Sequence, residues 1–331
     1  MKWQTGKILL LTLVMSLMLN TAVQAADVQG LICYGGPTND QGFNQMAYEG
    51  MNRAMTSFAP KLNMDVFINK KADKLSVEDI TKLGNKNDFI IGLGDVYLPI
   101  FAKLAASRPK TKFVVIDGDK NLGMINLLCV KFNDLEAGFL AGIAAGATTN
   151  TKNIGFIGGY KNLRSNQELL SGYKAGAYYV NPAIKVKSDF VGSFTDPEKL
   201  EKKALQMYGE RVDVIFHAAG MSGKGLFIAA AKVKKLAIGC DTNQRDTAPE
   251  EARPYILTSA LKRVDNAVYS IIDDIVNEKF KSGLRVEDCS TGGIGYADSS
   301  VNNKALVKAE PLLLDANAEL TLKAIKIPVV K

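Results

Sequence analysis

The chain has 331 residues, of which 47% are hydrophobic, and its formal net charge is +7 at pH 7. A chain of this length is expected to form about two domains and to bury a sizeable core. Its basic residues are spread along the sequence without interleaved aromatic residues, which argues against a nucleic-acid-binding protein.

The first 25 residues have the pattern of a secretory signal peptide. Lys2 and Lys7 are followed by the apolar run Ile8–Leu19 and by the small-residue site Val23–Ala25. We therefore expect cleavage after Ala25 and export of the remainder, because the apolar run is short for the alternative, a transmembrane anchor. No cysteine follows the run, so we expect no lipid anchor, and no later segment is apolar enough to span a membrane.

Apolar and amphipathic segments alternate along the rest of the chain. The first half predicts strand 31–34, helix 44–59, strand 64–68, a helix from Ser76, strand 88–93, helix 98–107 and strands 112–116 and 125–132. The second half predicts helix 135–145, strand 153–157, helix 167–180, strand 184–191, helix 197–208, strand 212–217, helix 223–233 and strands 236–240 and 255–260. Continuously apolar strands that alternate with helices indicate an α/β fold with parallel sheets covered on both faces. The two series, which meet near residue 133, predict two similar lobes.

Polar residues gather where these strands end. Gly94–Asp95, Asp117–Asp119, His217–Gly220 and Asp241–Gln244 each follow a predicted strand. Parallel sheets bind ligands at this edge, so the loops would converge on one cleft if the two lobes face each other there.

The most informative of these edges is Leu31–Gln45, LICYGGPTNDQGFNQ, where two glycines end the strand and polar residues surround one phenylalanine. An aromatic ring among amide and carboxylate groups suits a flat, polar small molecule better than a metal ion or a lipid. The alternative is structural: Phe43 would plug the base of its lobe, and Asn39, Asp40 and Asn44 would cap the next helix.

Other motifs do not point to catalysis. Cys33, Cys129, Cys240 and Cys289 are too far apart for a zinc or redox motif, so we expect mostly buried thiols, with a disulfide as the alternative. Gly220–Gly225, GMSGKG, lacks the hydroxyl residue that follows the lysine of a phosphate-binding loop, and it is better explained as a tight turn or helix start.

The single histidine, His217, would have to carry any catalytic triad or histidine zinc site alone, and we expect it to be packed at a strand end. The acid pairs Asp117/Asp119 and Asp134/Glu136 could serve acid–base chemistry, but such pairs are more typical of turns and helix starts. We therefore expect no catalytic residue, no metal and no cofactor.

Eight blocks in sequence order resemble the basic membrane protein family of substrate-binding lipoproteins, whose best-understood members are purine-nucleoside receptors of ABC importers. The blocks are NDQGFNQMAYEG (39–50), FNDLEAGFLAG (132–142), IGFIGG (154–159), SGYKAG (171–176), VGSFTDP (191–197), DVIFHAAG (213–220), AIGCDTNQ (237–244) and LTSALKRVDNAVY (257–269). The resemblance implies the type I periplasmic-binding-protein fold, in which two Rossmann-like lobes with parallel sheets are joined by hinge crossovers. It further implies interleaved lobes, 26–132 with about 261–288 and 133–260 with about 289–331.

The resemblance also implies how a nucleoside would be held. Phe43 and Phe216 would sandwich the base, and Asp241 and Lys262 would bind the sugar. The base edge would be bound by Asn39, Asp40, Asn44 and either Asp134 or Glu136, and Gly94, Ala219 and Gly220 would line the pocket.

The chain departs from the family pattern in lacking the lipid-attachment cysteine, in having Gly42 where serine is common, and in the segment 160–170 (YKNLRSNQELL). We therefore expect a monomeric periplasmic protein that is not lipid-anchored. It would bind a purine nucleoside by hinge closure and deliver it to an ABC permease in the membrane. The alternatives are a binding protein for another flat or sugar-like ligand such as riboflavin, an exported nucleoside-processing enzyme, and a receptor that signals to a membrane sensor.

Overall fold

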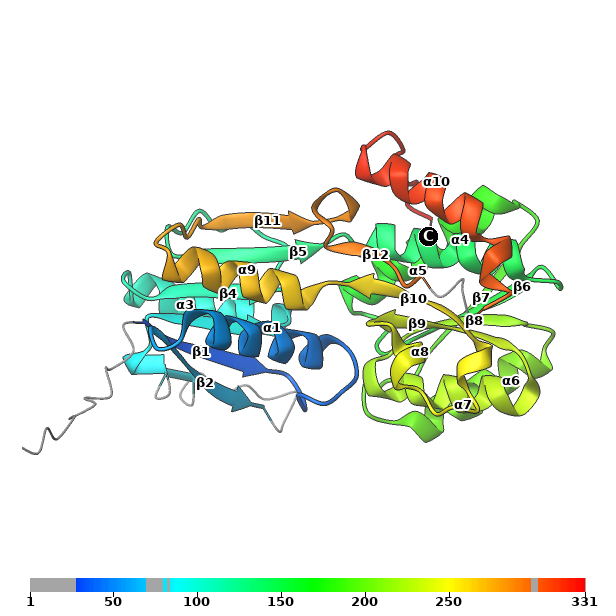
Figure 1. Ribbon diagram of the computed structural model, residues 1–331, viewed down its shortest axis with the longest axis horizontal. Helices are drawn as coiled ribbons and strands as arrows, with labels where there is room; N and C mark the ends of the chain where they lie inside the picture. The colour runs from blue at the N-terminus through cyan, green and yellow to red at the C-terminus, as the bar shows by residue number, and fades with distance from the viewer. Residues whose placement is uncertain (1–27, 70–79, 82–83, 299–302, 331) are drawn as a thin grey trace, which may run out of the picture.

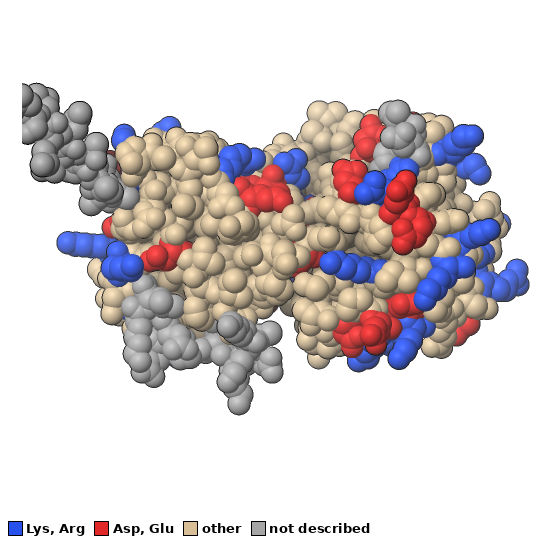
Figure 2. Space-filling view, turned by 60° about the horizontal axis from the view of Figure 1, so that its bottom comes forward, with Lys and Arg blue, Asp and Glu red and all other residues tan. Residues whose placement is uncertain are grey.

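The computed structural model describes residues 28–69, 80–81, 84–298 and 303–330. The predicted signal peptide and most of the helix predicted from Ser76 lie outside the described residues. The described chain forms two lobes of strands and helices that are joined by a narrower middle (Figures 1 and 2). Within the described part of the chain, no helix is both long and apolar enough to cross a bilayer.

A six-stranded sheet organises the first lobe, with strand order β11-β5-β4-β3-β1-β2 and parallel pairing throughout. Its strands are β1 (Val28–Tyr34), β2 (Leu62–Ile68), β3 (Phe89–Leu93), β4 (Lys112–Ile116), β5 (Leu127–Phe132) and β11 (Gly283–Glu287). The central strands β1, β3 and β4 are buried on both faces, as their uninterrupted apolar residues predict.

Helices cover both faces of this sheet. Helices α1 (Phe43–Phe58) and α9 (Val264–Val276) lie side by side on one face (Figure 1). Their close approach requires Gly50, because a Cβ there would lie 2.3 Å from the Asp265 carbonyl oxygen. Helix α3 (Leu98–Ser107) covers the opposite face, where Phe101 packs with the odd-numbered residues Leu31 and Cys33 of β1.

The second lobe repeats the plan with strand order β12-β10-β9-β8-β6-β7, in which only the β10–β12 pair is antiparallel. Its strands are β6 (Asn153–Gly158), β7 (Lys185–Phe190), β8 (Val214–Ala218), β9 (Leu236–Asp241), β10 (Ile256–Lys262) and β12 (Ile294–Tyr296). Its helices are α4 (Asp134–Thr148), α5 (Arg164–Val180), α6 (Pro197–Gly209), α7 (Lys224–Val233), α8 (Gln244–Thr247) and α10 (Glu310–Thr321). The prediction of an α/β fold built on two mainly parallel sheets is confirmed.

Helices α4 and α5 pack unusually close together, because glycines face each other across their contact. The glycines are Gly138 and Gly142 on α4 and Gly172 and Gly176 on α5. A Cβ at any of these positions would lie 2.0–2.2 Å from a backbone oxygen of the other helix. This close packing places the start of α5 beside the start of α4, at the junction of the lobes.

The chain passes between the lobes after β5, after β10 and after β11, and these crossings lie next to one another (Figure 1). The Asn133 N–H donates to the Glu287 carbonyl, and the Arg263 N–H donates to the Gly293 carbonyl, both at 2.8 Å. Adjacent crossings of this kind form a hinge about which two lobes can rotate.

Some elements differ from the sequence-based predictions. The bounds of α3 and β4 agree, whereas α5 begins at Arg164, about one turn before the predicted residue 167, and brings Arg164 to the lobe junction. Helices α9 and α10 and strands β11 and β12 lie beyond the last predicted element, strand 255–260. The two strands carry little apolar pattern, because β11 is a half-exposed edge strand and β12 has three residues. All four cysteines are buried free thiols.

Candidate functional site

A cavity of about 690 Å³ lies between the two lobes. Its first-lobe wall comes from the segments that follow β1, β3 and β4. Its second-lobe wall comes from the segments that follow β6, β7 and β8, from the ends of β9 and β10, and from the starts of α4 and α5. The cavity thus lies at the carboxyl ends of parallel strands, where α/β folds bind ligands, and its volume is typical of small-molecule sites.

Asp40 organises the loop that carries Phe43. Its Oδ1 accepts hydrogen bonds from the backbone N–H groups of Gly42 and Gln45, both at 3.0 Å. Its Oδ2 accepts from the backbone N–H of Asn44 at 3.1 Å and from the Asn44 side-chain Nδ2 at 2.9 Å. The carboxylate therefore accepts hydrogen bonds from N–H groups at the start of α1 that have no partner within the helix, so Asp40 caps this helix. Asp40 also borders the cavity.

Aromatic rings reach the cavity from both lobes. Phe43 borders it from the start of α1, and Tyr160 and Phe194 border it from the second lobe. The rings of Tyr160 and Phe194 pack edge to face with their centroids 5.1 Å apart. Because 37% of Phe194 and 45% of Tyr160 is exposed, these rings can still bury area against a ligand.

Asp241 presents a carboxylate to the cavity from the end of β9. It has a left-handed backbone conformation with φ at 68°, as do Gln41 and Asp117, at 56° and 65°, on the first-lobe side of the cleft. This conformation costs roughly 1–2 kcal/mol for an ordinary residue and tends to be retained at functional sites. Burial raises the pKa of Asp241 to about 6, although the positive charge of Lys262 opposes the shift.

Lys262 ends β10 and joins two carboxylates. Its Nζ lies 2.8 and 2.9 Å from the two oxygens of Asp117 and 3.1 Å from Oδ1 of Asp134. Burial alone would lower the pKa of Lys262, but these carboxylates raise it above its usual range, so the ammonium is charged. Its two hydrogen bonds leave one N–H for a further acceptor. Burial also raises the pKa of Asp134, against the effect of Lys262.

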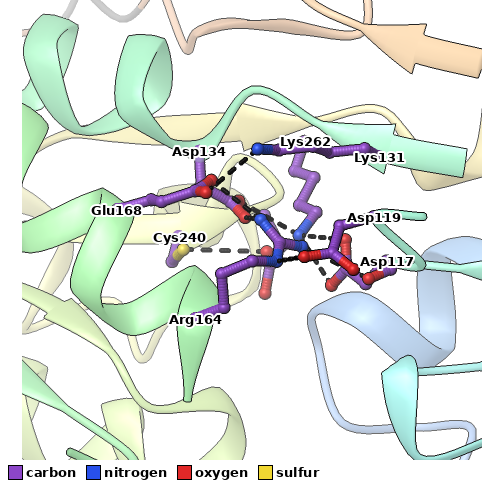
Figure 3. A network of polar contacts seen from close by, with 9 residues as sticks. Asp117, Asp119, Lys131, Asp134, Arg164, Glu168, Cys240 and Lys262 are labelled. Carbon is purple, nitrogen blue, oxygen red and sulfur yellow. Dashed lines mark hydrogen bonds and ion pairs between the residues drawn. The ribbon is translucent and has the colours of Figure 1, made fainter. Parts of the chain in front are cut away.

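Arg164, at the start of α5, lies beside this group (Figure 3). Its guanidinium donates to Glu168 Oε2 at 2.8 Å and to the Asp117 carbonyl at 3.2 Å. It also pairs with Asp119 at 3.6 Å and with Asp134 at 3.8 Å. These contacts join the second lobe to the turn after β4 in the first.

A second contact between the lobes lies at the loop 41–42. The Gln41 carbonyl accepts hydrogen bonds from Thr242 Oγ1 and from Gln244 Nε2, both at 3.2 Å. A Cβ on Gly42 would lie 3.1 Å from Oδ2 of Asp241, so the loops of the two lobes touch here. The lobes are therefore in contact beside the cavity, which is a closed arrangement.

The structure brings most of the predicted site residues to the cavity. Those that border it are Asp40, Phe43, Asn44, Gly94, Asp134, Gly220, Asp241 and Lys262. Gly94 has φ at 108°, a conformation that a side chain would strain, so its place at the wall depends on glycine.

Four predicted residues do not border the cavity. Phe216 is fully buried inside β8 and packs against Phe156 and Tyr173, so it belongs to the core. Glu136 accepts hydrogen bonds from Asn133 Nδ2 and from the Cys289 N–H, both at 2.7 Å, and so stabilises the crossings. The other two are Asn39, which is exposed, and Ala219, which is buried.

The most important residues that the sequence analysis missed lie in the segment 160–170 and in the loop after β7. They are Tyr160, Leu163, Arg164, Ser165, Asn166 and Leu169 in the first, and Ser193, Phe194 and Thr195 in the second. The rule that ligands bind beyond strand ends could have found them, because these segments follow β6 and β7.

The arrangement suits the binding of a polar molecule that has a flat part. Aromatic rings can stack on its flat part, while Asp241 and Lys262 offer one hydrogen-bond acceptor and one donor. His217 is buried with its Nε2 2.8 Å from Gln244 Oε1, and burial lowers its pKa to about 4, so it is a neutral packed histidine as predicted. Among the described residues, no group of His, Cys, Asp or Glu side chains is placed to hold a metal ion.

Solved structures share this fold. An ABC transporter solute-binding protein from Aeropyrum pernix K1 superposes with a TM-score of 0.76 over 92% of this chain and 94% of its own, at 21% identity. A solute-binding protein from Conexibacter woesei gives a TM-score of 0.70 over 91% of this chain and 99% of its own, also at 21% identity. The two-lobed architecture is thus that of the periplasmic solute-binding proteins of ABC systems.

Proteins related to this chain in sequence share more identical residues with it than these solved structures do. Basic membrane protein D of Borreliella burgdorferi is 33% identical over 71% of this chain and 68% of its own. The ABC transporter nucleoside-binding protein BmpA of Lactococcus lactis is 29% identical over 86% of both chains. The model of the Bmp family, described as PnrA-like ABC transporter substrate-binding proteins, matches residues 28–330. This chain therefore belongs to the Bmp family of ABC transporter substrate-binding proteins.

Proposed function

We propose that the cavity binds a purine nucleoside, which the protein captures outside the cytoplasmic membrane and delivers to an ABC permease. The observation that carries this proposal is the pairing of aromatic walls from opposite lobes, Phe43 and Phe194, with a carboxylate and an ammonium, Asp241 and Lys262, in one cavity. A nucleoside has the matching parts, a flat base and a sugar with vicinal hydroxyl groups.

The base lies between Phe43 and Phe194 in this proposal. Phe194 replaces Phe216 as the second ring, because Phe216 is covered by its neighbours in the core. Stacking on an aromatic side chain contributes roughly 1–3 kcal/mol per base. Asn44 borders the cavity beside Phe43 and offers an amide to the base edge.

The sugar lies next to the Phe43 ring, whose centroid is 5.3 Å from Lys262 Nζ. There Asp241 accepts hydrogen bonds from two hydroxyl groups, and the remaining N–H of Lys262 donates to one of them. Asp241 suits this role because, among the described residues, its side chain accepts only a weak hydrogen bond, from the Cys240 thiol at 3.6 Å. A buried hydrogen-bonding group left unpaired costs roughly 1–3 kcal/mol, so a ligand without these hydroxyls binds weakly.

Transport requires that the lobes open and close around the ligand. We propose that the moving bodies are 26–132 with about 261–288 and 133–260 with about 289–331, which rotate about the crossings between them. Closure buries the ligand and creates the surface that a permease recognises. Support for a binding role over catalysis comes from the family, whose members are substrate-binding proteins.

Isothermal titration calorimetry with the protein expressed from Ala26 onward tests the ligand class. Inosine, guanosine and adenosine should bind with one site per chain, whereas ribose alone and the free bases should bind at least tenfold more weakly, since each lacks one set of contacts. If riboflavin binds tightly and nucleosides do not bind, the proposed ligand is wrong and the site binds another flat molecule. The alternative of a nucleoside-processing enzyme is tested by incubating the protein with inosine and assaying for free base. Release of free base above background would support that alternative.

A further inference from the structure

The first observation concerns the position of Arg164 in its helix. Arg164 is the first residue of α5, and no acidic residue occupies the first turn of that helix. The start of a helix carries partial positive charge, so a cation there is unfavourable for the helix itself. The pair with Glu168 one turn later is the favourable contact that Arg164 makes within its own helix, and its other partners lie outside the helix.

Those partners belong to both lobes. Glu168 and Asp134 lie in α5 and α4 of the second lobe, whereas Asp119 and the Asp117 carbonyl belong to the turn after β4 in the first lobe. Only 22% of the Arg164 side chain is exposed, and the guanidinium lies between the two lobes in Figure 3. Its first-lobe contacts can exist only while the lobes are closed.

Two neighbouring ion pairs cross the same boundary. Lys131 of β5 pairs with Glu168 of α5 at 3.0 Å, and Lys262 of β10 pairs with Asp117. With Arg164 and Asp119 they form a continuous ionic patch that spans the lobes (Figure 3). The hydrogen bonds from Thr242 and Gln244 to the Gln41 carbonyl also join the lobes, and they involve uncharged groups.

We propose that Arg164 is a positioning residue for lobe closure, which holds a substantial fraction of the ligand-free protein closed through its contacts with Asp117 and Asp119. Arg164 borders the cavity, but its effect on closure needs no ligand, because its guanidinium donates to Glu168 in the second lobe and to the Asp117 carbonyl in the first. Since this contact is ionic and partly exposed, closure weakens as salt is added. The proposal requires a closing cleft but does not require that the ligand be a nucleoside.

Electron spin resonance distance measurements on the ligand-free protein provide the test. Spin labels are attached at Thr56→Cys on α1 and Lys202→Cys on α6, both exposed, whereas the four native cysteines are buried and stay unlabelled. The parent should show a closed population that shrinks in about 1 M salt, where the Debye length is only about 3 Å. Arg164→Gln should lower the ratio of closed to open protein about tenfold at low salt, the effect expected for one charge-assisted contact.

Matched variants separate closure from general destabilisation. Lys203→Gln removes an ion pair of similar exposure, with Asp189, which lies wholly within the second lobe, and it should leave the distances unchanged. Asp119→Asn should open the protein, and adding it to Arg164→Gln should have little further effect, because both changes remove the same contact. Arg164→Lys should be intermediate, since an ammonium keeps the charge but lacks the forked geometry.

The proposal is overturned if Arg164→Gln leaves the closed-to-open ratio and its salt response as in the parent, or if Lys203→Gln changes them equally. Because no ligand is added, an unchanged closed-to-open ratio would contradict the role of Arg164 but not the nucleoside proposal. Likewise, a protein that binds no nucleoside could still close through Arg164.

Discussion

Phe194 and Phe216 lie close to the same cleft but have different surroundings. Phe194 lies four residues beyond the end of β7, and 37% of it is exposed, whereas Phe216 is inside β8 with no exposed surface. We expect Phe194→Ala and Phe43→Ala each to weaken nucleoside binding by about 10- to 100-fold, because each removes one stacking surface. Calorimetry measures the affinity, and thermal melting should show little change for Phe194→Ala.

The matched control is Phe216→Leu. It should keep nucleoside affinity within a few-fold of the parent while losing roughly 1–3 kcal/mol of unfolding free energy, because it leaves a packing defect against Phe156 and Tyr173. The opposite outcome, with Phe216→Leu weakening affinity and Phe194→Ala leaving it unchanged, would restore Phe216 as the stacking ring.

If Asp241 binds the sugar as proposed, its carboxyl group should make ligand affinity pH-dependent. Burial raises its pKa to about 6, and the ionised form is the better acceptor for sugar hydroxyls, so binding favours loss of its proton. Affinity should therefore be constant above pH 7 and fall as the pH drops through 6. Calorimetry from pH 5 to pH 8 measures the affinity. The variant Asp241→Asn should bind the nucleoside weakly, and its affinity should depend little on pH. If its affinity changes with pH as in the parent, the group that titrates is another one, such as Asp134.

At the scale of elements, the glycines between α4 and α5 bring the two helix starts together. A Cβ on Gly142 would lie 2.2 Å from the Tyr173 carbonyl oxygen, so Gly142→Ala forces the helices apart and should cost roughly 1–3 kcal/mol of unfolding free energy. Denaturant unfolding measures this. Gly209→Ala, at a helical position with open space around it, is the control and should be neutral or slightly stabilising. Equal stability of the two variants would show that the close contact is not required.

The central elements could be predicted from the sequence because their pattern is local. Uninterrupted apolar runs and amphipathic segments identified β3, β4, α3 and most of the alternating series. Strand ends identified the cavity wall at β1, β3, β4, β8 and β9, but the segments after β6 and β7 were missed. Phe216 was placed at the site because its block resembles the family, yet it lies on the face of β8 that packs on α5, two residues before the strand ends. The return of the chain through β11 to the first sheet depends on a pairing with β5 more than 150 residues away, which no local pattern reveals.

At the scale of the whole molecule, function depends on how the lobes meet. The contacts of Arg164 with Asp119 and of Gln41 with Thr242 join residues that are close only when both lobes are folded and closed. Such contacts could not be read from one sequence, since they depend on the relative orientation of two sheets. On the face that Figure 2 presents, acidic and basic side chains are interspersed over the second lobe, so neither sign of charge dominates there.

Native mass spectrometry of the protein expressed from Ala26 onward tests the central claim most directly. The account predicts one added mass per chain that equals a purine nucleoside, either copurified or supplied in excess, and predicts that Asp241→Ala loses it while remaining folded. An added mass of another compound, or a nucleoside retained equally by Asp241→Ala, would contradict the proposed ligand or the proposed site.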